Sequence, residues 1–132
     1  MQPVKAVIFD MDGVLIDSYH AHFESWRMVA SEEGVDFSQD VFDRTFGRTS
    51  REIIRDVWGR RAATPERVES LDARKEAAYR DIISRDFPAM PGVGPLIDAL
   101  ASAGFKLAIG SSGPPENVAL VLSRLQRERL FS

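Results

Sequence analysis

Two short apolar runs, far apart in the chain, have the pattern of strands in a parallel sheet. Residues 4–9 (VKAVIF) are rich in β-branched side chains and end at residues 10–13 (DMDG), while residues 105–110 (FKLAIG) end at residues 111–113 (SSG). Each run predicts a buried strand with polar residues directly after it. Because neighbouring parallel strands end at the same edge of a sheet, the pattern predicts an α/β core with a site at that edge.

Between and after these runs, apolar residues recur at helical spacing. Thr49 and Glu52 have the spacing of a capping box, and Pro65 stands at the first position of a helix after Thr64. The helices expected from these signals cover residues 19–33, 50–58, 65–85, 95–103 and 115–127.

The helical residues between the two strands are too many for one crossover connection, which needs a single helix. We therefore interpret residues 18–88 as an inserted helical cap domain. Residues 1–17 and 89–132 then form the α/β core, and a chain of 132 residues is long enough for one such domain with its insertion.

Composition narrows the class of protein. Seventeen Lys and Arg residues against 20 Asp and Glu residues give a net charge of -3, which argues against a nucleic-acid partner. No apolar run approaches the roughly 20 residues that cross a bilayer, and the N-terminus lacks a signal-peptide layout, so we expect a cytoplasmic protein without a membrane partner. The absence of cysteine excludes disulfides, thiolate catalysis and Cys-based zinc sites.

The acidic turn after the first strand is the strongest chemical signal. Asp10 and Asp12 stand two residues apart, and ionising two carboxyls this close is unfavourable unless a cation neutralises them. Oxygen ligands suit Mg²⁺, which in turn suits a phosphate substrate. A solvated acidic turn that caps the next helix is the alternative explanation of a bare Asp-x-Asp pattern.

Residues 7–18 (VIFDMDGVLIDS) closely resemble the first motif of haloacid-dehalogenase-like phosphatases, in particular their beta-phosphoglucomutase-like branch. The resemblance implies a HAD-like Rossmannoid parallel-sheet core with an inserted all-helical cap. It also implies that Asp10 is the nucleophile, which forms an aspartyl-phosphate, and that Asp12 is the general acid and base. Mg²⁺ would be held by the Asp10 carboxylate and the Asp12 backbone carbonyl. Relatives that cleave carbon–halogen bonds lack the second Asp, so Asp12 favours phosphoryl transfer.

The loop after the second strand resembles the second motif of the same family, in which a Ser or Thr hydroxyl binds the phosphoryl group. The resemblance places Ser111, Ser112 and the backbone of Met11 at the phosphate, although a Ser-Ser-Gly sequence also fits a simple turn. Sugar-phosphate mutases of this branch have a Ser-Lys-Asn stretch here. The uncharged residues 113–115 (GPP) therefore favour a phosphatase.

The cap carries further candidates for substrate contact. His22 matches the histidine of the family's hinge helix, and the loop with Arg48, Thr49 and Arg51 resembles the cap loop that reads the distal group of the substrate. Lys75 lies on a later cap helix that can also face the cleft. Guanidinium groups beside a capping box suit a phosphate or a sugar hydroxyl, although a solvated helix start has the same pattern.

Members of the family continue beyond the last helix of this chain, and the continuation holds a third-motif Lys and a fourth-motif acid. This chain has no Lys after Lys106 and no Asp after Asp98. We therefore expect a C-terminally truncated member whose first strand has an unpaired edge. Such a chain would be impaired in activity by itself and would self-associate through that edge.

These observations favour a Mg²⁺-dependent phosphatase that acts on a small-molecule phosphate ester such as a sugar phosphate. The alternatives are a sugar-phosphate mutase, a noncatalytic fragment and a signalling receiver-like domain. A receiver needs a phosphoacceptor Asp after a third strand and a Lys after a fifth. Asp56 lies instead in a helical pattern, and Lys106 lies inside its strand.

Overall fold

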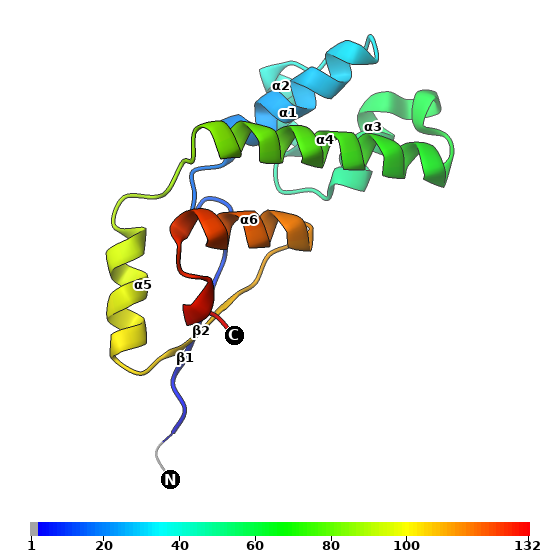
Figure 1. Ribbon diagram of the computed structural model, residues 1–132. Helices are drawn as coiled ribbons and strands as arrows, with labels where there is room; N and C mark the ends of the chain where they lie inside the picture. Colours follow the sequence, from blue (N-terminus) through cyan, green and yellow to red (C-terminus); the bar gives the residue numbers. More distant parts are fainter. Residues whose placement is uncertain (1–2) are drawn as a thin grey trace. The chain divides into compact units, whose positions relative to one another are not determined.

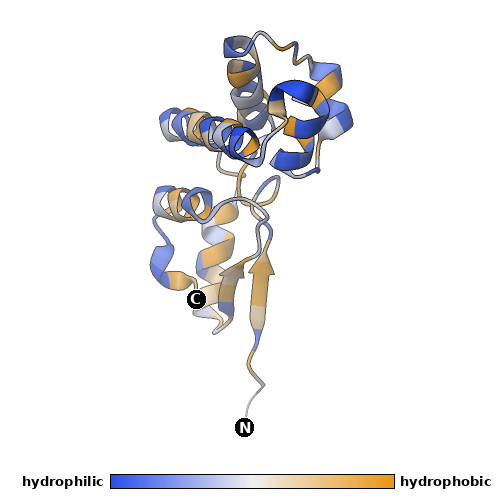
Figure 2. Ribbon diagram, turned by 90° about the vertical axis from the view of Figure 1, so that its right-hand side faces the viewer, coloured by the Kyte–Doolittle hydropathy of each residue, from blue (hydrophilic) through white to orange (hydrophobic). Residues whose placement is uncertain are grey.

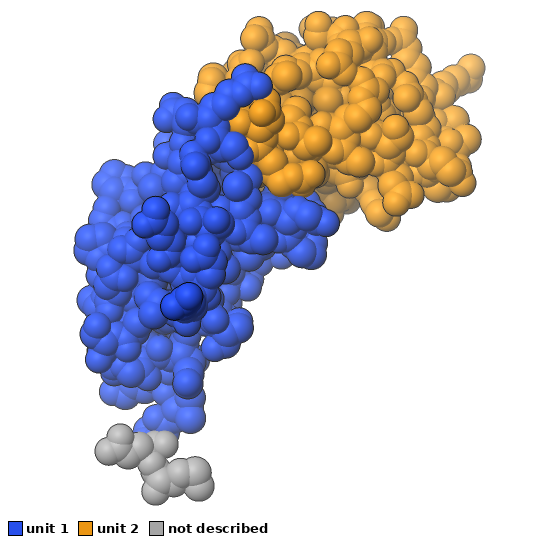
Figure 3. All heavy atoms as spheres, viewed as in Figure 1, with its two compact units in different colours: residues 1–19, 83–132 blue, residues 20–82 orange. Residues whose placement is uncertain are grey.

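The computed structural model describes residues 3–132, which form two compact units (Figure 3). The first, here called the core unit, contains the N-terminal residues up to Tyr19 together with Ile83–Ser132, and the second, the helical unit, is His20–Ile82. The boundaries predicted at residues 18 and 88 fall near the ends of the helical unit. The assignment of the units as catalytic core and cap stays a prediction.

The core unit contains a parallel pair of strands (Figure 1). Strand β1 (Ala6–Phe9) pairs with β2 (Lys106–Ile109), and the register sets Phe9 opposite Ile109. The Gly110 N–H donates to the Phe9 carbonyl at 2.8 Å, which continues the pairing just past the last residues of the strands. The described residues form this parallel pair and six α-helices, which confirms the predicted α/β class.

Strand β1 is more exposed than its sequence predicts. Phe9 alone among its four residues is buried, while Ile8 is 73% exposed although β1 is apolar (Figure 2). Successive side chains of a strand point to opposite faces, so Phe9 and Val7 lie on the better-covered face and Ile8 on the other. Among residues 3–132, β1 pairs with β2 and with no other strand. The prediction of a buried first strand is therefore wrong, whereas the predicted unpaired edge is present in the described chain.

Strand β2 has backbone partners on both of its edges. Beyond the short 3-10 helix η2 (Glu128–Leu130), Phe131 forms a parallel bridge with Leu107, and the Ser132 N–H donates to the Leu107 carbonyl at 2.9 Å. The side chain of Leu107 is buried between these neighbours, at 1% exposure. The second strand is therefore the better-covered strand of the core unit.

Two helices accompany the strands of the core unit, α5 (Val93–Ser102) and α6 (Pro115–Leu125). Helix α5 begins two residues before the predicted start at Pro95, because proline is tolerated throughout a first turn whose N–H groups have no acceptor in the helix. Helix α6 ends before the predicted residue 127, because Gln126 adopts a left-handed conformation with φ of 56°.

The helical unit is built on α1 (Tyr19–Glu32), α2 (Gln39–Thr45), α3 (Ser50–Trp58), the 3-10 helix η1 (Gly59–Ala62) and α4 (Pro65–Arg85). Helices α1, α3 and α4 confirm the prediction, but the sequence analysis missed α2. Helix α2 has seven residues, so its sequence pattern is short. Ser38 caps its start by accepting a hydrogen bond from the Val41 N–H.

Stacked and tilted aromatic rings fill the centre of the helical unit. Trp26 lies 5.8 Å from Phe37 and 6.0 Å from Trp58 between ring centroids, and all three side chains are buried. Leu71 of α4 is fully buried in the same cluster. In the part of the chain that the structure describes, no helix combines the length and the apolar composition that a membrane span requires.

Candidate active site

The register of the two strands brings the acidic turn and the serine loop to one edge of the sheet. Asp10 directly follows Phe9, and Ser111 comes two residues after Ile109, the partner of Phe9. The hydrogen bond from the Gly110 N–H to the Phe9 carbonyl holds the two strand ends together at this point. The core unit therefore places both predicted motifs at the carboxyl edge of a parallel sheet, where α/β proteins bind ligands.

Asp10 lies at the exposed end of β1. Its Oδ1 atom accepts a hydrogen bond from the Met11 N–H at 2.8 Å, while the Met11 side chain is fully buried. The side chain of Met11 is therefore not available to a ligand, and phosphate binding by Met11 stays a prediction.

Asp12 is oriented by a buried hydroxyl. The Ser18 hydroxyl, in a residue that is 2% exposed, donates to Asp12 Oδ1 at 2.6 Å. Gly13 has a φ of +76°, which favours glycine, and its N–H donates to the Ile16 carbonyl at 2.8 Å. The sequence analysis gave Ser18 no role, and its place inside the first motif was the signal that could have shown one.

The acidic turn carries oxygen donors that can be compared with the ligands that Mg²⁺ prefers. Among the described residues, no three His, Cys, Asp or Glu side chains gather in a group that could hold a metal ion. The Asp10 carboxylate and the Asp12 carbonyl are oxygen donors of the kind that Mg²⁺ prefers, and this ion usually keeps several waters and phosphate oxygens as its other ligands. The chemistry of these two donors therefore fits Mg²⁺.

The serine loop forms a compact turn into α6. Ser111 is half-buried, and its Oγ accepts a hydrogen bond from the Gly113 N–H at 3.1 Å, whereas Ser112 is exposed. Asn117, in the first turn of α6, is 2% exposed, and its Nδ2 lies 3.7 Å from the position that a Cβ on Gly113 would take. The sequence analysis missed this buried amide because a single Asn in a helical pattern gives no signal.

In the helical unit, Arg48, Thr49 and Arg51 gather at the start of α3. Thr49 and Glu52 form the predicted capping box, in which the Thr49 Oγ1 hydrogen bond is the main cause that lowers the pKa of Glu52. The Arg48 Nη1 lies 3.1 Å from Asp56 Oδ2, and Arg51 is exposed. The structural role of Thr49 is thus established, and substrate contact by these three residues stays a prediction.

The helical unit also brings together the other two candidates, His22 on α1 and Lys75 on α4. Lys75 Nζ lies 2.9 Å from His22 Nδ1, and Lys75 is buried at 2% exposure. The other histidine, His20, is exposed and lies at the start of α1.

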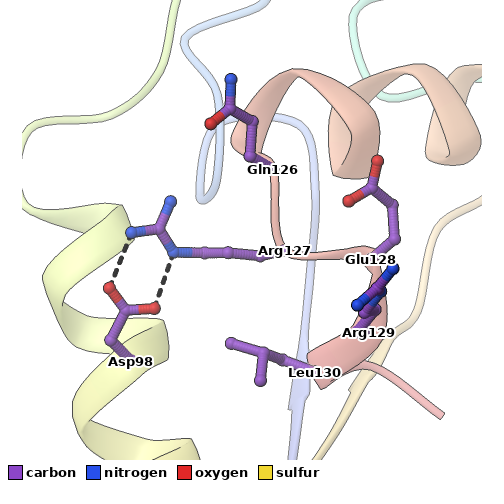
Figure 4. A pocket seen from close by; sticks show the side chains of 6 residues that line it. All are labelled: Asp98, Gln126, Arg127, Glu128, Arg129 and Leu130. Carbon is purple, nitrogen blue, oxygen red and sulfur yellow. Dashed lines mark hydrogen bonds and ion pairs between the residues drawn. The ribbon is translucent and has the colours of Figure 1, made fainter.

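A pocket of about 520 Å³ lies in another part of the core unit, around the C-terminal end of α6 (Figure 4). Two of its charged residues pair with each other: the Arg127 guanidinium makes two hydrogen bonds to Asp98, at 2.7 and 2.8 Å, and thereby lowers the pKa of that carboxyl. None of the predicted site residues lines this pocket. We therefore place the candidate site at the strand edge.

The chain matches the family model of haloacid dehalogenase-like hydrolases over residues 4–132. It is 30% identical over 128 residues to the phosphorylated carbohydrates phosphatase of Thermotoga maritima, covering 97% of this chain and 59% of that protein. It is also 30% identical over 128 residues to the beta-phosphoglucomutase of Bacillus subtilis, covering 92% of this chain and 56% of that protein.

A solved structure has the same arrangement. The crystal structure of a HAD hydrolase, family IA, variant 3, from Entamoeba histolytica aligns with a TM-score of 0.84 at 25% identity, covering 98% of this chain and 58% of that chain. The chain thus spans less than two thirds of the length of these relatives. Since the family model matches nearly every residue, the protein belongs to the haloacid dehalogenase-like hydrolases.

Proposed function

We propose that the protein is a Mg²⁺-dependent phosphatase that hydrolyses a small phosphorylated metabolite, such as a sugar phosphate, through an aspartyl-phosphate. The observation that supports this most is the register of β1 and β2, which sets Asp10 and Ser111 at the same sheet edge. The similarity to a phosphatase named for phosphorylated carbohydrates supports the substrate class.

In the proposed reaction, the Asp10 carboxylate attacks phosphorus and the bond from phosphorus to the leaving oxygen breaks. Mg²⁺ supplies the positive charge that screens the repulsion between the carboxylate and the phosphate dianion. Ser111 donates a hydrogen bond to a phosphoryl oxygen. Asp12 gives its proton to the leaving alkoxide and then takes a proton from the water that hydrolyses the aspartyl-phosphate. Ser18 orients Asp12 for both transfers through its hydrogen bond.

The proposal extends to the helical unit, where Arg48, Thr49 and Arg51 would bind the distal group of the substrate and His22 would contact it from the hinge. The exposed Arg51 is the best of these for a direct test, because it caps no helix. Replacing Arg51 by Ala should raise KM several-fold with little change in kcat. A change confined to kcat would contradict a binding role.

A sugar-phosphate mutase is the second candidate, because one relative is a beta-phosphoglucomutase. Residues 113–115 offer no charged side chain for a second phosphate, which favours the phosphatase. A hexose monophosphate separates the two functions: a phosphatase releases inorganic phosphate, whereas a mutase forms the isomeric monophosphate.

We also propose that the described chain self-associates through the open edge of β1. The support is the 73% exposure of Ile8 on a strand with one partner. Light scattering on the chain should give a mass above that of the monomer. A clean, stable monomer would contradict this part of the proposal.

The main test is phosphate release from a panel of sugar phosphates with and without Mg²⁺. Asp10→Asn should abolish the release, and omission of Mg²⁺ should do the same. Asp17→Asn is the matched control, because Asp17 is an exposed carboxyl close to the same turn. Release that survives in Asp10→Asn would refute the proposed nucleophile.

A further inference from the structure

The helical unit contains a buried ammonium group. Lys75 is 2% exposed, and its Nζ atom lies 2.9 Å from Glu76 Oε1 and 2.9 Å from His22 Nδ1. The same atom lies 5.2 Å from the centroids of the Trp26 and Tyr79 rings. A charge removed from water to this degree is stable only when ionic and hydrogen-bond partners replace its hydration. Glu76 and His22 supply these partners, and the two aromatic rings lie close to the same ammonium group.

The carboxylate of Glu76 is the ionic partner of Lys75. Glu76 is itself 8% exposed, and its Oε1 also accepts a hydrogen bond from the Ser50 hydroxyl at 3.4 Å. The pKa of Asp72, one turn earlier on α4, is raised, first by burial and then by the negative charge of Glu76. The cluster therefore has the geometry of a buried ion pair, with Glu76 Oε1 2.9 Å from the Lys75 Nζ atom.

A charged Lys75 determines which nitrogen of His22 carries the proton. An ammonium group has donors and no acceptor, so the His22 Nδ1 must accept the hydrogen bond with its lone pair. The imidazole is then neutral with its proton on Nε2. The plane of the His22 imidazole is also held, because the ring stacks on Tyr79 with 4.1 Å between centroids and an interplanar angle of 9°.

We propose that Lys75 and Glu76 are positioning residues that hold His22 as the neutral tautomer protonated at Nε2, so that His22 acts as a hydrogen-bond donor. Lys75 then acts through His22, in place of the direct substrate contact expected from the sequence. Only the last step, in which the Nε2 proton is offered to the phosphorylated substrate, depends on the proposed function. The tautomer itself is a property of the helical unit.

The tautomer can be read by NMR on the full chain labelled with ¹⁵N-histidine, from long-range proton–nitrogen correlations at a pH of about 8, above the ordinary pKa of histidine. The chain has two histidines, and the exposed His20 serves as the internal reference. We expect one tautomer for His22, with a protonated Nε2 and an acceptor Nδ1, and a mixture for His20. A protonated Nδ1, an imidazolium, or a mixture like that of His20 would overturn the proposal.

Lys75→Met tests the source of the effect, because it removes the donor and keeps an unbranched apolar stem. His22 should change to a tautomer mixture, while Lys106→Met, a change at an exposed lysine, should leave it unaltered. An unaltered His22 in Lys75→Met would overturn the role of Lys75. Because the NMR measurement of the His22 tautomer needs no substrate, its result does not depend on whether the phosphatase assay succeeds.

Glu76→Gln is the second variant, for the case in which Lys75→Met does not fold. It keeps the shape and the acceptor atom of the side chain and removes its charge. The Nδ1 resonance of His22 should shift towards that of His20, because a less firmly held ammonium donates a weaker hydrogen bond. An unchanged Nδ1 resonance would overturn the role of Glu76.

Discussion

The hydrogen bond from Ser18 to Asp12 gives the most specific energetic prediction for the catalytic turn. Its donor is 2% exposed and the distance to Asp12 Oδ1 is 2.6 Å. Hydrogen bonds to charged groups contribute about 1.5–3 kcal/mol. Because Asp12 is half-buried and keeps contact with water, we expect a value near the lower end of that range.

A double-mutant cycle isolates this contribution. Ser18 also precedes the first residue of α1, so Ser18→Ala alone could act through the helix start. Unfolding free energies of wild type, Ser18→Ala, Asp12→Ala and the double variant give the coupling between the two side chains, from which such separate effects cancel. We expect a coupling of about 1.5 kcal/mol, roughly a tenfold change in the unfolding equilibrium constant.

Urea denaturation followed by circular dichroism measures all four proteins, with Ser123→Ala on the exposed side of α6 as the control for a serine-to-alanine change. A coupling below about 0.3 kcal/mol would lie within the scatter for independent sites and would refute the reasoning. The hydrogen bond would then make no measurable contribution to stability.

Three further predictions concern the rest of the fold. Leu71→Ala should destabilise the helical unit by about 2–5 kcal/mol in a urea melt, because Leu71 is fully buried. The Arg74 hydrogen bond lowers the pKa of Glu33 in the folded protein, so the ionised Glu33 stabilises the fold above pH 4.5, its ordinary pKa. The loss of stability in Glu33→Gln should therefore be full above pH 4.5 and should become smaller as the pH falls below it. In Gly94→Ala, the new Cβ would lie 2.9 Å from the Arg127 guanidinium, which pairs with Asp98, and would disturb that pair. An NMR titration should then show the Asp98 pKa rising towards its ordinary 3.8.

The sequence predicted those features that depend on neighbours in the chain. The capping box at Thr49 and the start of α4 at Pro65 follow from residues three or fewer positions apart, and both are present. The parallel pairing is an exception, because it joins residues 100 positions apart and was inferred from two apolar runs whose polar ends belong at one sheet edge. The capping box and the start of α4 could be predicted from local patterns because their backbone hydrogen bonds do not depend on distant side chains.

Features that depend on distant contacts could not be predicted in the same way. His22 and Lys75 are 53 residues apart, so their 2.9 Å contact and the effect on the His22 proton are visible only in the folded helical unit. The exposure of Ile8 likewise depends on what packs over its face of the strand pair and not on its own apolar side chain. Helix α2 is too short for a helical repeat to distinguish it from a loop.

The central claim is that Asp10 becomes phosphorylated at the edge of the sheet. The most direct measurement is mass spectrometry of the Asp12→Asn variant after incubation with acetyl phosphate and Mg²⁺, since loss of the base should slow hydrolysis of the aspartyl-phosphate. We expect one phosphoryl group on Asp10, and none in a variant that also carries Asp10→Asn. A phosphoryl group on Asp56, which lies on α3, or no label on Asp10, would contradict the account.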